Sequence, residues 1–272
     1  MDMLDTSKVE FSNKDMKDKI ILPSKLDDKL SHFLGIHMGD GCLSRQNKGY
    51  RLCYDGHYIN EFDWYYTYLS KLIKSIFNKD VVPIKGHNSI RISFDSKAIH
   101  SFLNKVCGLP AGPKDKCAVP EMIMKAAPSI QKAFLRGMAD TDISLVFKNR
   151  HKNINYYPVI DYQTCNKELQ SSLIRILQSM GFKVYFNSRM KKRKNRYYLS
   201  HYFQINGLEA FNKWNSEIGF TSYNQLTKIK VWKKFGFLPS NTTIKDRLDF
   251  LECKKDIFYF NKQKDKNALA QT

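Results

Sequence analysis

The sequence predicts an α+β fold made of two tandem copies of one unit, in the order helix, strand, strand, helix, strand, strand, helix (αββαββα). Residues 32–44 and 133–147 share one pattern, in which a short apolar helix ends in a small residue and an aspartate and continues into a strand-like run. The order of strand and helix signals after each segment also repeats. Since 42% of the 272 residues are hydrophobic, the chain can form a real core.

In the first copy, alternating apolar residues predict strands, and apolar residues three or four positions apart predict helices. After the opening helix and strand within 32–44, the expected elements are a strand at 50–58, a helix at 61–77, a hairpin of strands 81–86 and 89–94 around His87-Asn88, and a helix at 96–106. Gly108 and Pro110 end the last helix.

The second copy follows the same order. Its expected elements are strands at 143–148 and 156–164, a helix at 167–180, strands at 183–189 and 197–205 with a basic tip between them, and a helix at 208–218. Neither copy covers both faces of a four-stranded sheet alone, so we expect the two opening helices to pack against each other as a pseudo-two-fold pair. The predicted division is an N-terminal extension (1–28), a first repeat (29–107), a linker (108–130), a second repeat (131–235) and a C-terminal tail (236–272).

The chain is strongly basic, with 45 Lys and Arg against 26 Asp and Glu and a net charge of +19. Such a surface attracts polyanions, of which nucleic acid is the commonest, with an anionic membrane as the rival. No apolar run approaches the roughly 20 residues of a membrane span, and residues 1–15 lack the apolar core of a secretory signal. Six scattered cysteines without a CxxC pair argue against zinc and disulfides, so we expect an intracellular protein of the cytoplasm, nucleoid or an organelle matrix.

Small residues line one face of each opening helix. Gly35 and Gly39 are four positions apart in the first copy, and the second copy has Ala133, Gly137 and Thr141. Such stripes let two helix backbones approach closely. Asp40 and Asp142 come one residue after the stripes, so packing of the helices would bring the two carboxylates together at one end.

That end is the negative end of both helix dipoles, so two carboxylates there repel each other unless a cation lies between them. Carboxylate oxygens suit Mg²⁺, or another divalent cation such as Mn²⁺ or Ca²⁺, which can activate water and stabilise a leaving oxygen in phosphodiester hydrolysis. The plainer interpretations are a gene duplication without chemistry, and aspartates that only cap helices. Equivalent acids in both copies favour the metal site.

The segments FLGIHMGDG (33–41) and LRGMADTDI (135–143) resemble the two LAGLIDADG motifs of monomeric homing endonucleases. GLPAGPKDKCAVP (108–120) and EIGFTSYNQLTKI (217–229) extend the resemblance, which covers roughly 30–235. It implies two saddle-shaped antiparallel sheets that straddle the major groove of a long double-stranded DNA site. It further implies a monomer acting as a pseudo-dimer and Mg²⁺-dependent cleavage of both strands across the minor groove.

The resemblance assigns roles residue by residue. The carboxylates of Asp40 and Asp142 and the backbone carbonyls of Gly39 and Thr141 would bind metal. Asn166 and Lys167 match a polar pair that orders solvent near the scissile phosphates, and their first-copy counterpart lies near Gly56-His57. Lys114 matches a basic residue that polarises the site.

Two departures from the family pattern lie in the second half. Asn224 stands where a second lysine is expected and cannot supply its charge. Ile143 replaces the glycine that ends the second motif, and a β-branched residue disfavours the left-handed conformation that glycine adopts freely. We therefore expect the half containing Asp142 to be the weaker one.

Base reading in the major groove needs side chains on the exposed sheet faces. The candidate DNA-binding residues are Arg45, Arg51, Tyr54, Lys85, His87, Arg91, Lys148, Arg150, Lys152, Arg189, Lys191, Lys192, Arg193, Lys194, Arg196, Tyr198 and His201. The run at 189–196 is expected at a hairpin tip, where it would hold phosphates rather than read bases.

The sequence thus predicts a site-specific double-strand DNA endonuclease that uses a divalent metal at paired aspartates. One alternative is a cleavage-deficient DNA- or RNA-binding protein on the same scaffold, such as an intron maturase, which the Ile143 and Asn224 departures favour. A basic structural protein, such as a ribosomal component, would explain the charge but not the paired motifs.

Overall fold

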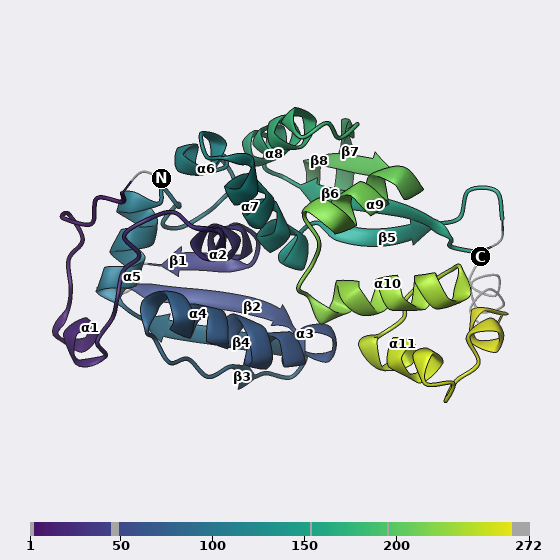
Figure 1. Cartoon of the computed structure of the whole chain (residues 1–272), viewed down its shortest axis with the longest axis horizontal. Coiled ribbons are helices and arrows are strands. Elements are labelled where there is room, and N and C mark those ends of the chain that lie inside the picture. Colours follow the sequence, from purple (N-terminus) through teal and green to yellow (C-terminus); the bar gives the residue numbers. More distant parts are fainter. Residues whose placement is uncertain (1–2, 45–48, 153, 195, 263–272) are drawn as a thin grey trace.

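The computed structural model describes residues 3–44, 49–152, 154–194 and 196–262, and it confirms the predicted α+β fold (Figure 1). Two four-stranded antiparallel sheets have the same strand order, β1-β2-β4-β3 and β5-β6-β8-β7. The opening helices of the two repeats, α2 and α7, lie side by side at the centre, between the two sheets.

The first repeat consists of α2 (Asp28–Gly39), β1 (Gly41–Ser44), β2 (Arg51–His57), α3 (Tyr58–Trp64), η1 (Tyr65–Leu69), α4 (Ser70–Phe77), β3 (Ile84–Lys85), β4 (Ser89–Asp95), α5 (Lys97–Ser101) and η2 (Phe102–Val106). The π-helical turns η1 and η2 continue their neighbours, so the predicted helices at 61–77 and 96–106 are confirmed as continuous helical segments. Asp27 caps α2 by accepting a hydrogen bond from the Leu30 amide.

The second repeat consists of α7 (Pro128–Thr141), β5 (Ser144–Lys148), β6 (Tyr157–Thr164), α8 (Lys167–Ser179), β7 (Tyr185–Arg193), β8 (Arg196–Asn206) and α9 (Leu208–Glu217). The short α6 (Glu121–Met124) precedes α7. After α9 come α10 (Tyr223–Phe235), which ends at the predicted limit of the repeat, and α11 (Ile244–Leu251), and these two helices pack together. None of the described helices is long and apolar enough to cross a bilayer.

The strands β7 and β8 are longer than the sequence predicts. Pairing continues to Arg193 opposite Arg196, so residues 189–193 lie in a strand and not in the hairpin tip expected at 189–196. Beyond the core this hairpin has no buried face, and every residue of β7 except Lys191 is exposed. Apolar alternation is therefore missing from its outer half, which made the strand resemble a polar turn.

The seam between α2 and α7 is a contact between backbones. A Cβ atom built on Gly35 would lie 2.1 Å from the carbonyl oxygen of Phe134, and one on Gly137 would lie 2.1 Å from the carbonyl oxygen of His32. Any side chain at either position would push the helices apart. A buried network also joins the halves: Asp140 lies 2.8 Å from His32 Nε2 and accepts hydrogen bonds from the backbone amides of Thr221 and Ser222.

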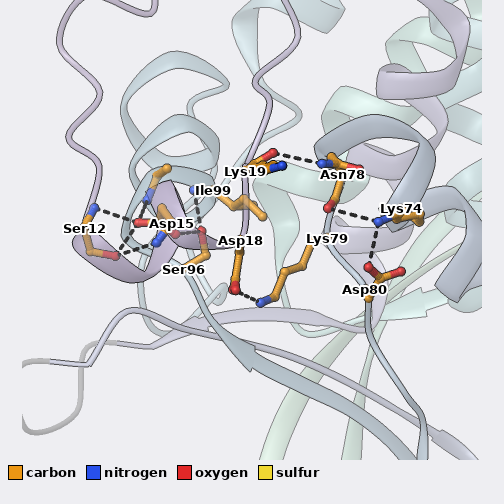
Figure 2. Close-up of polar contacts among 11 residues, drawn as sticks. Ser12, Asp15, Asp18, Lys19, Lys74, Asn78, Lys79, Asp80, Ser96 and Ile99 are labelled. Atoms are coloured by element: carbon orange, nitrogen blue, oxygen red, sulfur yellow. Dashed lines mark hydrogen bonds and ion pairs between the residues drawn. The ribbon is translucent and has the colours of Figure 1, made fainter.

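The N-terminal extension is fastened to the first repeat by polar contacts (Figure 2). Asp15, in α1 (Asn13–Lys17), is buried, and its carboxylate accepts hydrogen bonds from Ser12, the Ser96 hydroxyl and the Ala98 amide. It thereby links α1 to the first turn of α5. Asp18 forms an ion pair with Lys79, and the side-chain Nδ2 of Asn78 donates a hydrogen bond to the backbone carbonyl oxygen of Lys19.

Candidate metal and nucleic-acid site

Asp40 and Asp142 are the C-caps of α2 and α7, so the seam places both at the same end of the helix pair. A Cβ atom built on Gly39 would lie 3.5 Å from Cγ of Asp142, which shows how closely that carboxyl group approaches the neighbouring motif. Asp40 is half-buried and Asp142 is exposed, so the pair lies at a surface. The small-residue stripes therefore bring the two acids together as expected.

The two carboxyl groups repel each other when both are ionised. Crowding by protein atoms raises the pKa of Asp40 well above its usual range, and the charges of Asp142 and Glu61 raise it further. Although Asp142 is exposed, the protein atoms around it also raise its pKa, and the charge of Lys114 opposes this effect. A cation between the two groups would relieve their repulsion.

Lys114 lies at this end of α2, in the segment between the repeats. Its Nζ donates hydrogen bonds to the carbonyl oxygens of His37 (3.2 Å), Met38 (2.8 Å) and Gly39 (2.6 Å). Burial lowers the pKa of Lys114, and attraction to Asp142 and Asp40 opposes that shift. The predicted basic helper is thus brought to the acids, and it occupies the Gly39 carbonyl that was predicted to bind metal.

The second half has no equivalent cation among the residues that the structure describes. The hydroxyl of Thr141 donates to the carbonyl oxygens of Gly137 and Met138 within its own helix. Asn224 does not supply the missing positive charge, and its Oδ1 accepts a hydrogen bond from Arg247. The two acids consequently have different surroundings.

The backbone strain expected at Ile143 is not found. Neither Gly41 nor Ile143 has a positive φ angle, so the position does not require glycine's backbone freedom. Glycine is needed at 41 because a Cβ there would lie 2.4 Å from Nδ1 of His37. The repeat has Ala139 where the first copy has His37, which leaves space for the buried Ile143.

Asn166 is not free to order solvent as predicted. Its side chain caps α8 through the Leu169 amide, and Nδ2 donates to the carbonyl oxygens of Lys114 (2.7 Å) and Cys117 (2.6 Å). Asn166 is buried and holds the segment that carries Lys114. Lys167 beside it is exposed at the first position of α8, and the proposed solvent role remains a prediction for that residue alone.

Sequence reasoning missed Glu61 near the first acid. It lies in the first turn of α3 and accepts a hydrogen bond from the His57 amide, and burial raises its pKa. A Cβ on Gly56 would lie 2.5 Å from Oε2 of Glu61. The glycine in an otherwise regular strand was the available signal of a close approach.

Most of the predicted DNA-binding residues are at least partly exposed on the sheet faces opposite the helices, or in adjoining turns. These are Arg51, His87, Arg91, Lys148, Arg150, Lys152, Arg189, Lys191, Arg193, Lys194, Arg196 and Tyr198. Arg51 pairs with Asp95, and Arg91 pairs with Asp55, so acids across the strand hold both guanidinium groups. Arg45 lies outside the described residues.

Four predicted DNA contacts are corrected by the register. Tyr54 is fully buried and bonds to His37, and His201 is buried and bonds to Ser188. Lys85 lies opposite the buried Ile90, and Lys192 opposite Tyr197, so both fall on the helix-side face. A register shift of one residue moves a side chain to the other face, and the sequence did not fix the register.

The exposed face of the second sheet also has residues that were not predicted. Tyr185, Asn187, Tyr202 and Gln204 line a hollow of about 500 Å³ beside Arg150. Asp161 accepts a hydrogen bond from Nε2 of Gln204 and so orients that amide. Their strand parity matches Arg189 and Lys191, which was the signal that could have found them.

The residues at the helix ends fit a hard divalent cation. Two carboxylates with raised pKa values offer oxygen donors, which such ions prefer. No group of three His, Cys, Asp or Glu side chains converges anywhere in the described part of the chain. An ion held by Asp40 and Asp142 would thus take its remaining ligands from backbone, water or phosphate oxygens.

Comparison with known proteins shows the fold. No family model matches the chain. A structure of mesophilic variants from the homing endonuclease I-DmoI has a TM-score of 0.51 at 14% identity and covers 71% of this chain and 95% of that one. I-DmoI in complex with DNA and Mn has a TM-score of 0.50 at 14% identity, with 72% and 98% covered. The expected resemblance is therefore confirmed as a shared fold.

Two curated relatives match in sequence over part of the chain. A DNA polymerase of Methanocaldococcus jannaschii is 26% identical over 143 residues, which are 53% of this chain and 8% of that protein. A subunit of the A-type ATP synthase of Pyrococcus abyssi is 28% identical over 119 residues, which are 43% of this chain and 11% of that protein. The matched region is about a tenth of either relative's length.

Proposed function

We propose that this chain, which has the fold of the LAGLIDADG homing endonucleases, is a site-specific endonuclease that cleaves double-stranded DNA with a divalent cation. The observation that carries the proposal is the meeting of Asp40 and Asp142 at one end of a helix pair with backbone contact. Basic sheet faces flank that end and suit a long duplex.

In this proposal the residues divide the work. Asp40 and Asp142 hold the cation, which supplies Lewis acidity toward a phosphodiester when bound. Lys114 adds a positive charge beside both acids, and that charge opposes the rise in their pKa values. Asn166 fixes the segment of Lys114, while the sheet faces hold the duplex so that its backbone passes the acids.

A cleavage-deficient DNA- or RNA-binding protein, such as an intron maturase, is the second candidate. The observation that favours it is the unequal second half, where the described residues place no cation on the last turn of α7 and the amide of Asn166 is fully engaged. Both candidates predict nucleic-acid binding, and cleavage of DNA separates them.

The test is cleavage of a randomised duplex library in Mg²⁺, with Asp40→Asn and Asp142→Asn beside the wild type. We expect sequence-specific cutting by the wild type, and binding without double-strand cutting by either variant. Binding of a selected duplex by the wild type, with no cut in Mg²⁺ or Mn²⁺, would overturn the nuclease and leave the second candidate.

A further inference from the structure

A second polar hollow, of about 360 Å³, lies beside the edge strand β5, and neither of the paired aspartates lines it. It is enclosed by β5, α3, α10 and the segment 238–242. Asn155, Asn224, Lys228, Ser240 and Thr242 are among its polar lining residues, and no acidic side chain in the described chain lines it. The metal chemistry of the proposed nuclease does not involve this hollow.

One cation, Lys228, lines the hollow, and a second, Arg247, donates a hydrogen bond to the lining residue Asn224. Lys228 donates to the carbonyl oxygen of Leu145 (3.0 Å) and to Oε1 of Gln225 (3.1 Å), which are both uncharged. Arg247 is fully buried, and its Nη1 has no hydrogen-bond partner within the described structure. The carboxylate of the adjacent Asp246 is engaged by Lys255 and Thr243.

The two cations affect each other. Burial lowers the pKa of Lys228 to about 8, and the charge of Arg247 contributes to that lowering. Buried charge without a counter-charge is costly, and an anion between or beside the two groups would remove that cost.

Arg247 also fixes the orientation of Asn224. A guanidinium only donates hydrogen bonds, so the Asn224 atom 2.8 Å from Nη2 is the carbonyl oxygen Oδ1. The amide NH₂ group of Asn224 is then left to donate elsewhere along the hollow. The third N–H of Lys228 and the hydroxyl groups of Ser240 and Thr242 add further donors.

We propose that this hollow binds a phosphate group, either as free inorganic phosphate or as a backbone phosphate of bound DNA. Clustered N–H and O–H donors with positive charge and no carboxylate suit a tetrahedral oxyanion. The hollow adjoins β5, whose Lys148 faces the proposed DNA surface, so the second source rests on the proposed function. Binding of free inorganic phosphate does not depend on the proposed function.

The first test uses inorganic phosphate alone and compares thermal unfolding in phosphate with unfolding in chloride at equal ionic strength and pH. A site with a dissociation constant near 1 mM should raise the Tm of the wild type by roughly 3 °C at about 20 mM phosphate. Lys228→Gln should lose this shift. Lys230→Gln, which removes an exposed lysine two positions along the same helix, should keep it.

Equal phosphate shifts in all three proteins, or no shift in any, would overturn the proposal. Equal circular dichroism in chloride shows that Lys228→Gln folds. The second test measures affinity for duplex DNA against salt. If DNA supplies the phosphate, Lys228→Gln should lower the salt slope by about 1 relative to Lys230→Gln. An unchanged slope beside a lost phosphate shift assigns the hollow to free phosphate, whether or not the chain cleaves DNA.

Discussion

At the scale of single residues, Lys114 combines two tasks that usually need separate side chains. Its ammonium donates hydrogen bonds to three carbonyl oxygens in the last turn of α2, and its charge opposes the rise in the pKa of both Asp40 and Asp142. Because those carbonyls form the negative end of the helix dipole, the same contact neutralises the end at which the acids meet.

Lys114→Met should therefore lower Mg²⁺-dependent cleavage by about 10- to 100-fold. Without the ammonium the pKa of both aspartates rises, so the acid limb of the rate profile should move to higher pH. Single-turnover cleavage rates across a pH series measure both effects.

The matched control is Lys116→Met, since Lys116 is exposed and two residues away. A pH profile of Lys114→Met that superimposes on that of the control would contradict the electrostatic role. Equal Tm values for the two variants separate this role from a loss of folding.

The role of a single residue was predictable where the same residue type occurs at equivalent positions of both copies. It was not predictable where the role depends on a neighbouring side chain in the fold. Asp40 and Asp142 stand out because both copies have them. The exchange of glycine for Ile143 was explained wrongly, because the need for a small residue at the equivalent Gly41 comes from the His37 ring and not from the backbone. Glu61 has no counterpart in a motif, and it becomes relevant only through its place beside Asp40.

At the scale of elements, the helix pair is the part that tolerates least change. Between Gly35 and Phe134 there is no space for one methyl group, and the obstructing atom is a backbone oxygen that cannot rotate away. The distance between the helices is therefore set by the main chain.

Gly35→Ala should destabilise the protein by about 3 kcal/mol or more, because the helices must separate to admit the methyl group. Gly108→Ala is the control, since its position has a φ of +73° and nothing within 4 Å of an added Cβ. That variant should cost only the conformational strain of about 1–2 kcal/mol. Urea unfolding measures both, and equal losses would contradict the contact seam.

The N-terminal extension is an element that depends on one charged group. Burial alone would raise the pKa of Asp15, but hydrogen bonds from Ser12 and Ser96 outweigh it, and the net pKa is lowered. A lowered folded-state pKa means that the ionised carboxylate stabilises the fold above its ordinary pKa of 3.8, and that this contribution disappears as the pH falls through the lower value.

Asp15→Asn should cost about 2 kcal/mol at neutral pH, as expected for hydrogen bonds to a charged group. The gap from the wild type should narrow below about pH 4. Urea unfolding at several pH values measures the gap, with the exposed Asp28→Asn as the control. A gap that stays constant down to about pH 2 would count against the ionised carboxylate.

The ends of helices and strands could be predicted from the sequence only where an element buries one face, because burial of one face gives a periodic apolar pattern. The helices and inner strands bury one face, so their apolar periods are visible. The outer half of the β7–β8 hairpin buries neither face, and its basic residues indicated a turn instead of a strand. The strand register was hard to predict for the same reason. Lys85 and Lys192 were assigned to the wrong sheet face, because a charged residue alone does not show which face it occupies.

At the scale of the whole molecule, the net charge of +19 accompanies two sheets of the same strand order, whose exposed faces carry many of the basic side chains. Counter-ion release then makes binding of a duplex depend steeply on salt. The β7–β8 hairpin should contribute through Lys191, Arg193 and Arg196, which share the exposed face.

Changing these three residues to Gln should lower the slope of log affinity against log salt by up to about 2.7. The control changes Lys8, Lys14 and Lys17 to Gln, which removes the same charge from the N-terminal extension. Fluorescence anisotropy over a salt series measures both slopes. Equal slopes would mean that total charge, and not the hairpin, governs binding.

The main-chain seam between α2 and α7 also divides the positions of the chain by their freedom to vary under selection. Substitution of Gly35 or Gly137 would change the spacing of the helices. Selection therefore opposes it, whichever ligand the sheets bind. Strand positions such as the exposed Asn187 and the half-buried Gln204 do not lie at that seam and carry no such constraint. In the proposed nuclease, a new recognition sequence can therefore evolve on the sheets while the geometry at the helix ends stays fixed.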